Sequence, residues 1–248
     1  MSIDYLDAAA AAGSGYKSTL AAAMDIRPGH AVLDLGCGPG IDLRDMADHA
    51  GPAGSVIGVD HDPEMLAEAA RRLHDHPRVS LRAGDAHHLP LRDASVDRAR
   101  TDRVLQHVRD PAAVLAELHR VLRPGGLLAM AEPDWDTLTV SDEDISMSRA
   151  FARFVAGRVA NCTIGRQLVR LAPQAGLRIR SVEAVPVLLR DFDTADRIFG
   201  LRRNTARAVR TRAIRERDAA PWLARLEAGP MLATTIIYLV TASRQVSS

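Results

Sequence analysis

The sequence predicts an α/β protein with a parallel, doubly wound sheet. Short apolar segments alternate with helical segments through residues 31–131, as expected for five strands joined by covering helices. The first strand runs into a loop with three glycines, and the second ends in an acidic residue. Because the carboxyl ends of parallel strands meet along one edge of a sheet, we expect a ligand to bind there.

The first strand and its loop lie in residues 31–40, Ala-Val-Leu-Asp-Leu-Gly-Cys-Gly-Pro-Gly. The apolar residues suit a strand that is covered on both faces. Gly36, Gly38 and Gly40 permit positive φ angles and let a ligand approach bare backbone. A flat or elongated ligand is therefore expected across this loop.

Two phosphate-binding motifs can be compared with this loop. The dinucleotide fingerprint needs a third glycine where the chain has Ile41. A P-loop needs a lysine after its glycines, but the only lysine of the chain, Lys17, lies upstream. Both comparisons weaken the case for a phosphate site.

The second strand, at residues 55–60, ends in Asp60, which follows Asp34 by 26 residues. This separation is typical of a βαβ unit in which a carboxylate accepts hydrogen bonds from the ligand's ribose hydroxyls. Capping of the next helix is the alternative role for Asp60. Asp62 is better placed for capping because it precedes Pro63.

The third strand is expected at residues 78–82, and Gly-Asp-Ala at 84–86 follows it. His87 and His88 come next, but no carboxylate or cysteine at ligand spacing accompanies them. The two cysteines suggest neither a disulfide framework nor a zinc site. We expect no metal site and interpret the histidines as solvated loop residues.

The fourth strand, at residues 96–101, contains Arg98 and Arg100. An unpaired charge in a central strand is costly, so each arginine must pair, extend to solvent or mark a short strand. Arg100 and Arg103 could also bind the carboxylate of a cofactor or an acidic group of a substrate through bidentate contacts.

The fifth strand is expected at residues 127–131, after a turn at 123–126. Glu132, Asp134 and Trp135 follow it and are expected on the rim that faces the substrate. For Trp135, packing beneath the next helix is an equal alternative.

Two further strands are expected in the second half of the chain, at residues 177–189, interrupted or ended near Pro186, and at 231–241. The intervening residues 191–229 predict a helical cap that is rich in arginine. A nucleic-acid-binding patch is the alternative, but the lack of interleaved aromatic residues and the net charge of +1 favour a solvated surface. The other helices are expected at residues 16–24, 41–49, 63–74, 110–122, 144–159 and 167–174.

The stretch Asp-Leu-Gly-Cys-Gly-Pro-Gly closely resembles the first motif of class I S-adenosylmethionine-dependent methyltransferases. Asp60 and the tripeptide at 84–86 match later motifs in order, and the likeness spans about residues 30–135. The chain is also similar to the small-molecule branch related to quinone biosynthesis. The resemblance implies S-adenosylmethionine as cofactor and a Rossmann-like, mostly parallel sheet of seven strands, with the last strand antiparallel beside the sixth.

The resemblance also implies roles for particular residues. Asp85 would accept a hydrogen bond from the adenine amino group, and the backbone amide of Ala86 would meet the ring. His107 is the candidate general base, with a hydrogen bond to the backbone as its alternative role. The complete set of expected cofactor-binding residues is Asp34, Gly36, Gly38, Gly40, Asp60, His61, Met65, Gly84, Asp85, Ala86, Thr101 and Arg103.

N-terminal helices often fold over the cofactor in this family. Residues 1–28 are therefore expected to form lid helices, with Tyr5, Tyr16 and Lys17 as possible lid residues. A helix that simply packs against one edge of the sheet is the alternative.

We expect one cytoplasmic domain over residues 1–248, with cap insertions at about 139–175 and 191–229. No charged and apolar leader opens the sequence, and its apolar runs are shorter than the ~20 residues that span a bilayer. The net charge of +1 gives no general attraction to nucleic acid or membrane. A monomer or homodimer is expected.

The leading functional hypothesis is methyl transfer to a small molecule, such as an aromatic or terpenoid metabolite. Two alternatives use the same fold and cofactor pocket. One is a cyclase that binds S-adenosylmethionine without transferring its methyl group, and the other is an inactive binding or regulatory subunit.

Overall fold

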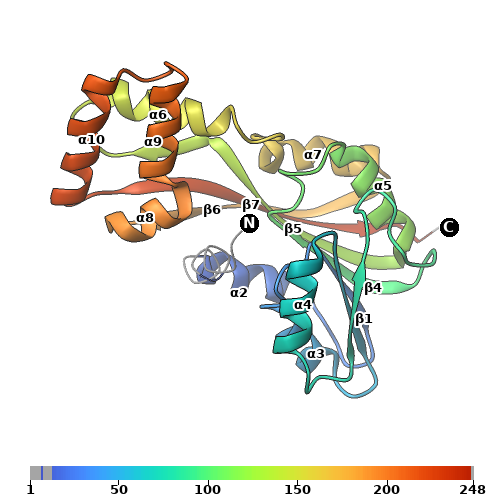
Figure 1. Ribbon diagram of the computed structural model, residues 1–248. Coiled ribbons are helices and arrows are strands. Elements are labelled where there is room, and N and C mark those ends of the chain that lie inside the picture. Colours follow the sequence, from blue (N-terminus) through green and yellow to red (C-terminus); the bar gives the residue numbers. More distant parts are fainter. Residues whose placement is uncertain (1–6, 8–12, 247–248) are drawn as a thin grey trace.

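The fold is a seven-stranded sheet in a computed structural model that describes residue 7 and residues 13–246 (Figure 1). The strand order is β3-β2-β1-β4-β5-β7-β6, and only β7 runs antiparallel to its neighbours. This confirms the predicted mostly parallel sheet with an antiparallel last strand. The strands are β1 (Ala31–Leu35), β2 (Ser55–Asp60), β3 (Val79–Ala83), β4 (Val96–Asp102), β5 (Leu122–Val140), β6 (Leu177–Leu189) and β7 (Ala233–Arg244).

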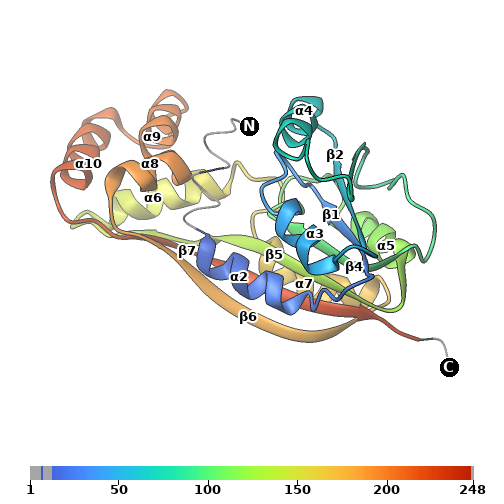
Figure 2. The same cartoon turned by 90° about the horizontal axis from the view of Figure 1, so that it is seen from below.

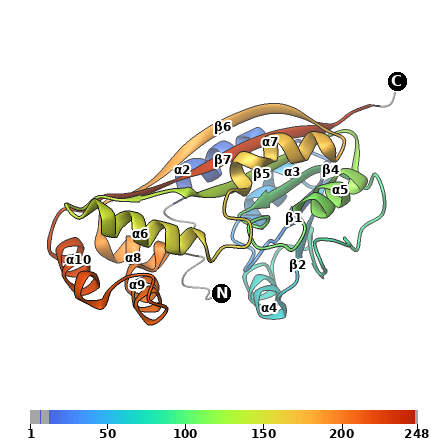
Figure 3. The same ribbon diagram turned by 90° about the horizontal axis from the view of Figure 1, so that it is seen from above.

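Different helices cover the two faces of the sheet (Figures 2 and 3). Helices α2, α3 and α4 share one hydrophobic core with α6, α8, α9 and α10, whereas α5 and α7 enclose a second core on the other face. The helices are α2 (Ser14–Ala23), α3 (Leu43–Ala50), α4 (Pro63–Arg72), α5 (Pro111–Val121), α6 (Ile145–Ala156), α7 (Ile164–Gln174), α8 (Phe192–Phe199), α9 (Leu201–Arg210) and α10 (Glu216–Ala228). The predicted lid residue Tyr5 lies outside the described residues.

The fifth strand is much longer than the sequence suggested. We expected a turn at residues 123–126, but β5 runs through 19 residues without ending there. Its first residues continue the pairing with β4 across an irregularity in register, and its last residues pair with β7. Residues 123–126 have no partner in β4, because the pairing passes from Val96 with Leu122 to Arg98 with Leu127, and Gly125 has a φ angle of 81°. The expected turn is thus present as an irregularity within β5.

Strand β6 continues through Pro186, so the expected interruption there was wrong. Pro186 pairs in register with Ile236 of β7. Because β6 is the outermost strand, the missing N–H of Pro186 can face away from the sheet and no ladder hydrogen bond is lost.

Strands β5, β6 and β7 extend beyond the rest of the sheet, and helices α6, α8, α9 and α10 gather on this extension (Figure 1). We call these four helices the cap. Trp222 and Phe151 are completely buried at its centre, with ring centroids 5.1 Å apart. Within the described part of the chain, no helix is long and apolar enough to cross a membrane.

Candidate active site

A cavity of about 910 Å³ opens at the carboxyl ends of β1, β2 and β4. This is the edge at which the sequence predicted a ligand. The expected site residues that line the cavity are Gly36, Gly38, Asp60, His61, Met65, Gly84, Asp85, Ala86, Arg103 and His107. The structure therefore brings ten of the expected residues to one cavity.

The glycine loop forms one wall of the cavity because its backbone takes conformations that side chains resist. Gly36 and Gly38 have φ angles of 73° and 53°. A Cβ atom on Gly36 would lie only 2.3 Å from a methyl carbon of Val104, a contact that would push the facing loop away. A bare backbone is thus required at this point.

Asp60 holds the loop from the end of β2. One carboxylate oxygen accepts a hydrogen bond from the backbone N–H of Gly38 at 2.8 Å, and the other accepts from that of Asp62 at 3.0 Å. Each carboxylate oxygen has more than one acceptor site, so Asp60 can also accept from a ligand in the cavity. Asp62 itself caps α4 by accepting from the N–H of Glu64, as predicted.

Asp85 lies beside His87, and this pair corrects one interpretation. The ring of His87 contacts the Asp85 carboxylate at 2.6 Å through Nδ1, and its Nε2 accepts from the N–H of Asp110 at 3.2 Å. Both ring nitrogens of His87 thus have protein partners, so the prediction of a solvated side chain was wrong for His87. Hydrogen bonds from His87 lower the pKa of Asp85.

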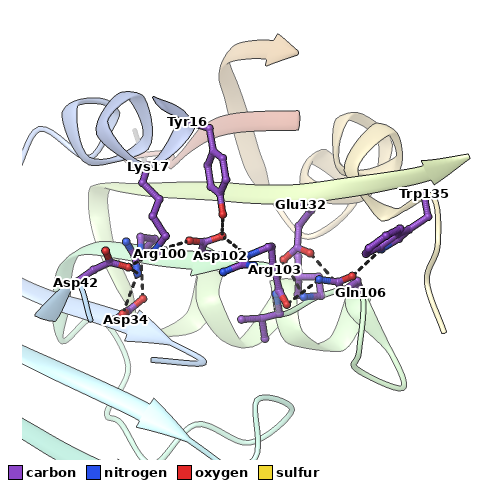
Figure 4. A network of polar contacts seen from close by, with 12 residues as sticks. Tyr16, Lys17, Asp34, Asp42, Arg100, Asp102, Arg103, Gln106, Glu132 and Trp135 are labelled. Carbon is purple, nitrogen blue, oxygen red and sulfur yellow. Dashed lines mark hydrogen bonds and ion pairs between the residues drawn. The ribbon is translucent and has the colours of Figure 1, made fainter. Parts of the chain in front are cut away.

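Three expected site residues, Asp34, Gly40 and Thr101, do not line the cavity. Asp34 is buried and forms a bidentate ion pair with Arg100, with distances of 2.9 and 3.1 Å (Figure 4). Arg100 also contacts Asp42 at 2.7 Å. The arginine that looked costly within a central strand is thus paired with two carboxylates, one of which belongs to the first motif.

This network continues into helix α2 (Figure 4). Lys17 forms ion pairs with Asp42 and, at 3.1 Å, with Asp102, and the hydroxyl of Tyr16 donates to Asp102 at 3.0 Å. Although burial acts against ionisation, the charges of Arg103 and Lys17 lower the pKa of Asp102 to about 2. Asp102 lines the cavity, so α2 is tied directly to the candidate site.

The turn after β4 has an unusual backbone that β5 holds in place. Arg103 has a φ angle of 59°, which is uncommon for a residue with a side chain. Its N–H donates to the carbonyl oxygen of Ala131 at 2.8 Å. Glu132 then accepts from the N–H groups of Val104, at 2.9 Å, and Leu105, at 2.8 Å, and also from that of Gln106 at 3.3 Å.

Glu132 and Asp134 are fully buried, so their expected position on an open rim was wrong. The three backbone donors occupy the Glu132 carboxylate, and Asp134 pairs with Arg166. Burial raises the pKa of Glu132 to about 8, while the amide donors oppose this shift because they stabilise the carboxylate.

We expect Glu132→Gln to lower the thermal midpoint of unfolding by roughly 2–10 °C. The side-chain N–H₂ of glutamine would face backbone N–H groups and leave at least one of them without an acceptor. An unsatisfied buried donor costs about 1–3 kcal/mol. Differential scanning calorimetry measures the effect. Glu183→Gln makes the same chemical change at an exposed position of β6 and serves as the control. Equal midpoints for the two variants would contradict the role assigned to Glu132.

Trp135 joins the site to the cap. Its indole N–H donates to the side-chain oxygen of Gln106 at 2.8 Å, and its ring meets Phe199 of α8 edge to face, with centroids 6.2 Å apart. Gln106 lines the cavity, although Trp135 itself packs against the hydrophobic core. Of the two roles considered for Trp135, packing is observed, and a position facing the substrate stays a prediction.

Three comparisons place the chain among known proteins. A family model described as a methyltransferase domain matches residues 33–130. The chain is 49% identical to an uncharacterized 37.1 kDa protein in transposon TN4556 of Streptomyces fradiae, over 97% of this chain and 70% of that protein. It is also 33% identical to a demethylmenaquinone methyltransferase of Lactobacillus johnsonii, over 50% of this chain and 52% of the relative.

The chain belongs to the class I S-adenosylmethionine-dependent methyltransferases. Its relatives include enzymes of the quinone-biosynthesis branch, as the sequence indicated. Each of the first matches to a named methyltransferase covers less than two thirds of that relative's own length. An S-adenosylmethionine-dependent methyltransferase from Mesorhizobium loti shares the fold, with a TM-score of 0.58 and 23% identity over 92% of this chain and 96% of that one.

The cofactor of this methyltransferase is S-adenosylmethionine, and the cavity fits it chemically. Gly36 leaves the wall of the cavity bare, and the Asp60 carboxylate retains acceptor sites for vicinal hydroxyl groups. Asp85 presents a carboxylate at the end of β3 that can accept from an amino group. These residues would hold the cofactor along the glycine loop.

Sequence reasoning missed several residues that line the methyltransferase cavity. Asp102 is the most important of them, because it ends β4 at the same edge of the sheet as Asp60 ends β2. An acidic residue at a strand's carboxyl end was the available signal. The others are Leu35, Val59, Asp62, His87, Val104, Gln106, Val108 and Arg109.

Proposed function

We propose that this methyltransferase transfers the methyl group of S-adenosylmethionine to a small-molecule acceptor. The observation that supports this most strongly is the single cavity of about 910 Å³, which contains Asp60 and Asp85 as well as His107 and Arg109. Its volume lies at the upper end of the ~300–1,000 Å³ range of small-molecule pockets, so it can hold an acceptor beside the cofactor.

The cofactor supplies an activated methyl group on a cationic sulfur, so the chain's own residues mainly bind and orient. Asp60 and Asp85 would hold the two ends of the nucleoside part of the cofactor, and His107, which follows the turn at Arg103, lines the same cavity. Removal of water around the ring lowers the pKa of His107, and the charge of Arg103 lowers it further. The imidazole is thereby kept neutral and able to accept a proton from a hydroxyl or amine acceptor.

We further propose that residues 1–248 act as one domain, in the cytoplasm, as a monomer or homodimer. The lid would be the N-terminal segment, and the cap insertions would cover the acceptor. The ties from Tyr16 and Lys17 to Asp102 support a lid, since they join α2 to a residue of the cavity. The relative named as a demethylmenaquinone methyltransferase favours an aromatic acceptor.

Calorimetric titration with S-adenosylhomocysteine tests the proposal first, on protein freed of any cofactor retained during purification. We expect micromolar binding, followed by methylated products in a screen of small metabolites. Failure of folded protein to bind would overturn the proposal. A product of unchanged mass would instead support the cyclase, and binding without turnover would support an inactive subunit.

A further inference from the structure

The near-neutral net charge of +1 hides a strong division of charge along the chain. Residues 1–140 contain 14 lysines and arginines but 21 aspartates and glutamates, a net charge of −7. Residues 141–232 contain 17 arginines and 10 acidic residues, a net charge of +7. The half that forms the cofactor site is therefore acidic, and the half that includes the cap is basic.

Part of the basic charge lies on one face of α9. Arg203, Arg207 and Arg210 follow the i, i+4, i+7 spacing of a helix face and extend over about 10 Å. Leu201 and Ala208 are buried on the opposite face, toward the other cap helices. The three arginines thus form a row on the outer side of the cap.

Within the described part of the chain the arginines of the row form no ion pair, as is also true of Arg149, Arg153 and Arg197, whereas other arginines of the cap have acidic partners. Arg202 pairs with Asp196 and Glu227, and Arg225 pairs with Asp142. Among the described residues, no carboxylate forms an ion pair with the three arginines of the row. Their charge remains available to an external anion.

The position of α9 relates this charge to the cavity. Helix α4, which follows the Asp60 strand, and the cap helices stand on the same side of the sheet, and α9 lies nearer to α4 than α10 does (Figures 2 and 3). The lining of the cavity contains four carboxylates, from Asp60, Asp62, Asp85 and Asp102, and two guanidinium groups, from Arg103, which pairs with Asp102 at 3.3 Å, and from Arg109. An anion attracted to the cap would therefore approach on the side where the cavity residues lie.

A small molecule fits these features better than a nucleic acid. The aromatic residues of α8 and α10, Phe192, Phe199 and Trp222, are all buried, so these helices offer no exposed ring on which a base could stack. The candidate site is a cavity with arginines in its lining, and guanidinium groups pair well with carboxylates and phosphates.

We infer that the methyl acceptor carries an anionic group, a carboxylate or a phosphate, which the basic cap attracts and orients. The inference rests on the proposed function. The division of charge matches the charges of the two ligands, since the acidic half holds a cationic cofactor and the basic half receives an anionic acceptor. Opposite charge at the mouth of a site raises encounter rates by about 10- to 1,000-fold at low salt.

The first test uses acceptors in matched pairs of an anion and a neutral analogue, such as phenolic carboxylates with their carboxamides and phenolic phosphates with their dimethyl triesters. Transfer of a radioactive methyl group gives kcat/KM for each. We expect the anionic member to be preferred by about tenfold at low salt. The preference should shrink between about 10 mM and about 1 M salt, because the Debye length falls from about 30 Å to about 3 Å.

The second test changes the row itself in an R203Q/R207Q/R210Q triple variant. The matched control is R170Q/R178Q/R180Q, which removes the same charge from exposed positions of α7 and β6. We expect the first variant to lose about tenfold in kcat/KM for anionic acceptors only, and the control to keep the activity of the parent.

Binding of pyrenetrisulfonate, followed by fluorescence anisotropy, gives a readout that needs no turnover. The parent and the control should bind the dye at low salt, and the α9 variant should bind it about tenfold more weakly. Equal binding by all three proteins, or equal rates for charged and neutral acceptors, would overturn the inference while leaving methyl transfer in place. Loss of S-adenosylhomocysteine binding would instead overturn the proposed function.

Discussion

Replacement of Arg100 by methionine is expected to lower the free energy of unfolding by about 3–5 kcal/mol, the cost of leaving a buried charge without its partner. The Asp34 carboxylate is nearly inaccessible to solvent and accepts two hydrogen bonds from Arg100. Asp42 would lose its ion pair with Arg100 and keep only the one with Lys17. Urea denaturation, followed by circular dichroism, measures the change.

A second variant separates the ion pair from simple loss of packing. Replacing both partners, in Arg100→Met with Asp34→Leu, removes the uncompensated charge and should recover most of the lost stability. A single variant that unfolds at the same urea concentration as the parent would show that the pair does not support the fold. A double variant no more stable than the single one would assign the loss to the size and shape of the side chains.

Asp60→Ala is expected to weaken binding of S-adenosylhomocysteine by at least about 10- to 150-fold. This corresponds to the loss of one charge-assisted hydrogen bond worth about 1.5–3 kcal/mol. Asp60 lines the cavity and has free acceptor sites beyond those used by Gly38 and Asp62. Isothermal titration measures the dissociation constant.

Asp110→Ala is the control for this variant. It removes the capping hydrogen bonds at the start of α5, from a residue that does not line the cavity, and should lower stability without changing affinity. If folded Asp60→Ala protein bound as tightly as the parent, the ribose role of Asp60 would be refuted.

The sequence was most informative where local pattern and pairing agree. The short apolar strands, the glycine loop and the acidic residue at the end of β2 are features of consecutive residues, so the mostly parallel sheet and the edge that holds the cavity could be predicted. The helix start at Asp62 and Pro63 was equally local.

What failed depended on residues distant in sequence. Glu132 was expected on the rim because it directly follows the fifth strand. Its carboxylate instead accepts from the N–H groups of Val104 and Leu105, which lie far from it in sequence. The ion pair of Asp34 with Arg100, 66 residues later in the chain, could not be predicted from local pattern, and a role of Asp34 in binding the cofactor stays a prediction. The fifth strand also includes Leu122, on the N-terminal side of the expected turn, because Leu122 pairs with Val96 of β4, and no local pattern reveals this pairing.

The sequence showed that residues 191–229 are rich in arginine, but the division of charge between the two parts of the chain was missed for another reason. Composition was judged over the whole chain, where +1 suggests no electrostatic preference. The boundaries of β5 and β7 show where to divide the chain, and the two parts then have net charges of opposite sign.

The continuity of β5 and β7 has a mechanical consequence. Both strands pass without a break from the cofactor half into the cap, so the two halves share one hydrogen-bonded ladder instead of a flexible linker. Swinging the cap as a body would break that ladder. The ladder between β5 and β7 is irregular only between Asp134 and Thr139, beside Trp135, so bending of the molecule is concentrated at that point. We therefore expect the distance between the cap helices and the cofactor half to change little during a catalytic cycle.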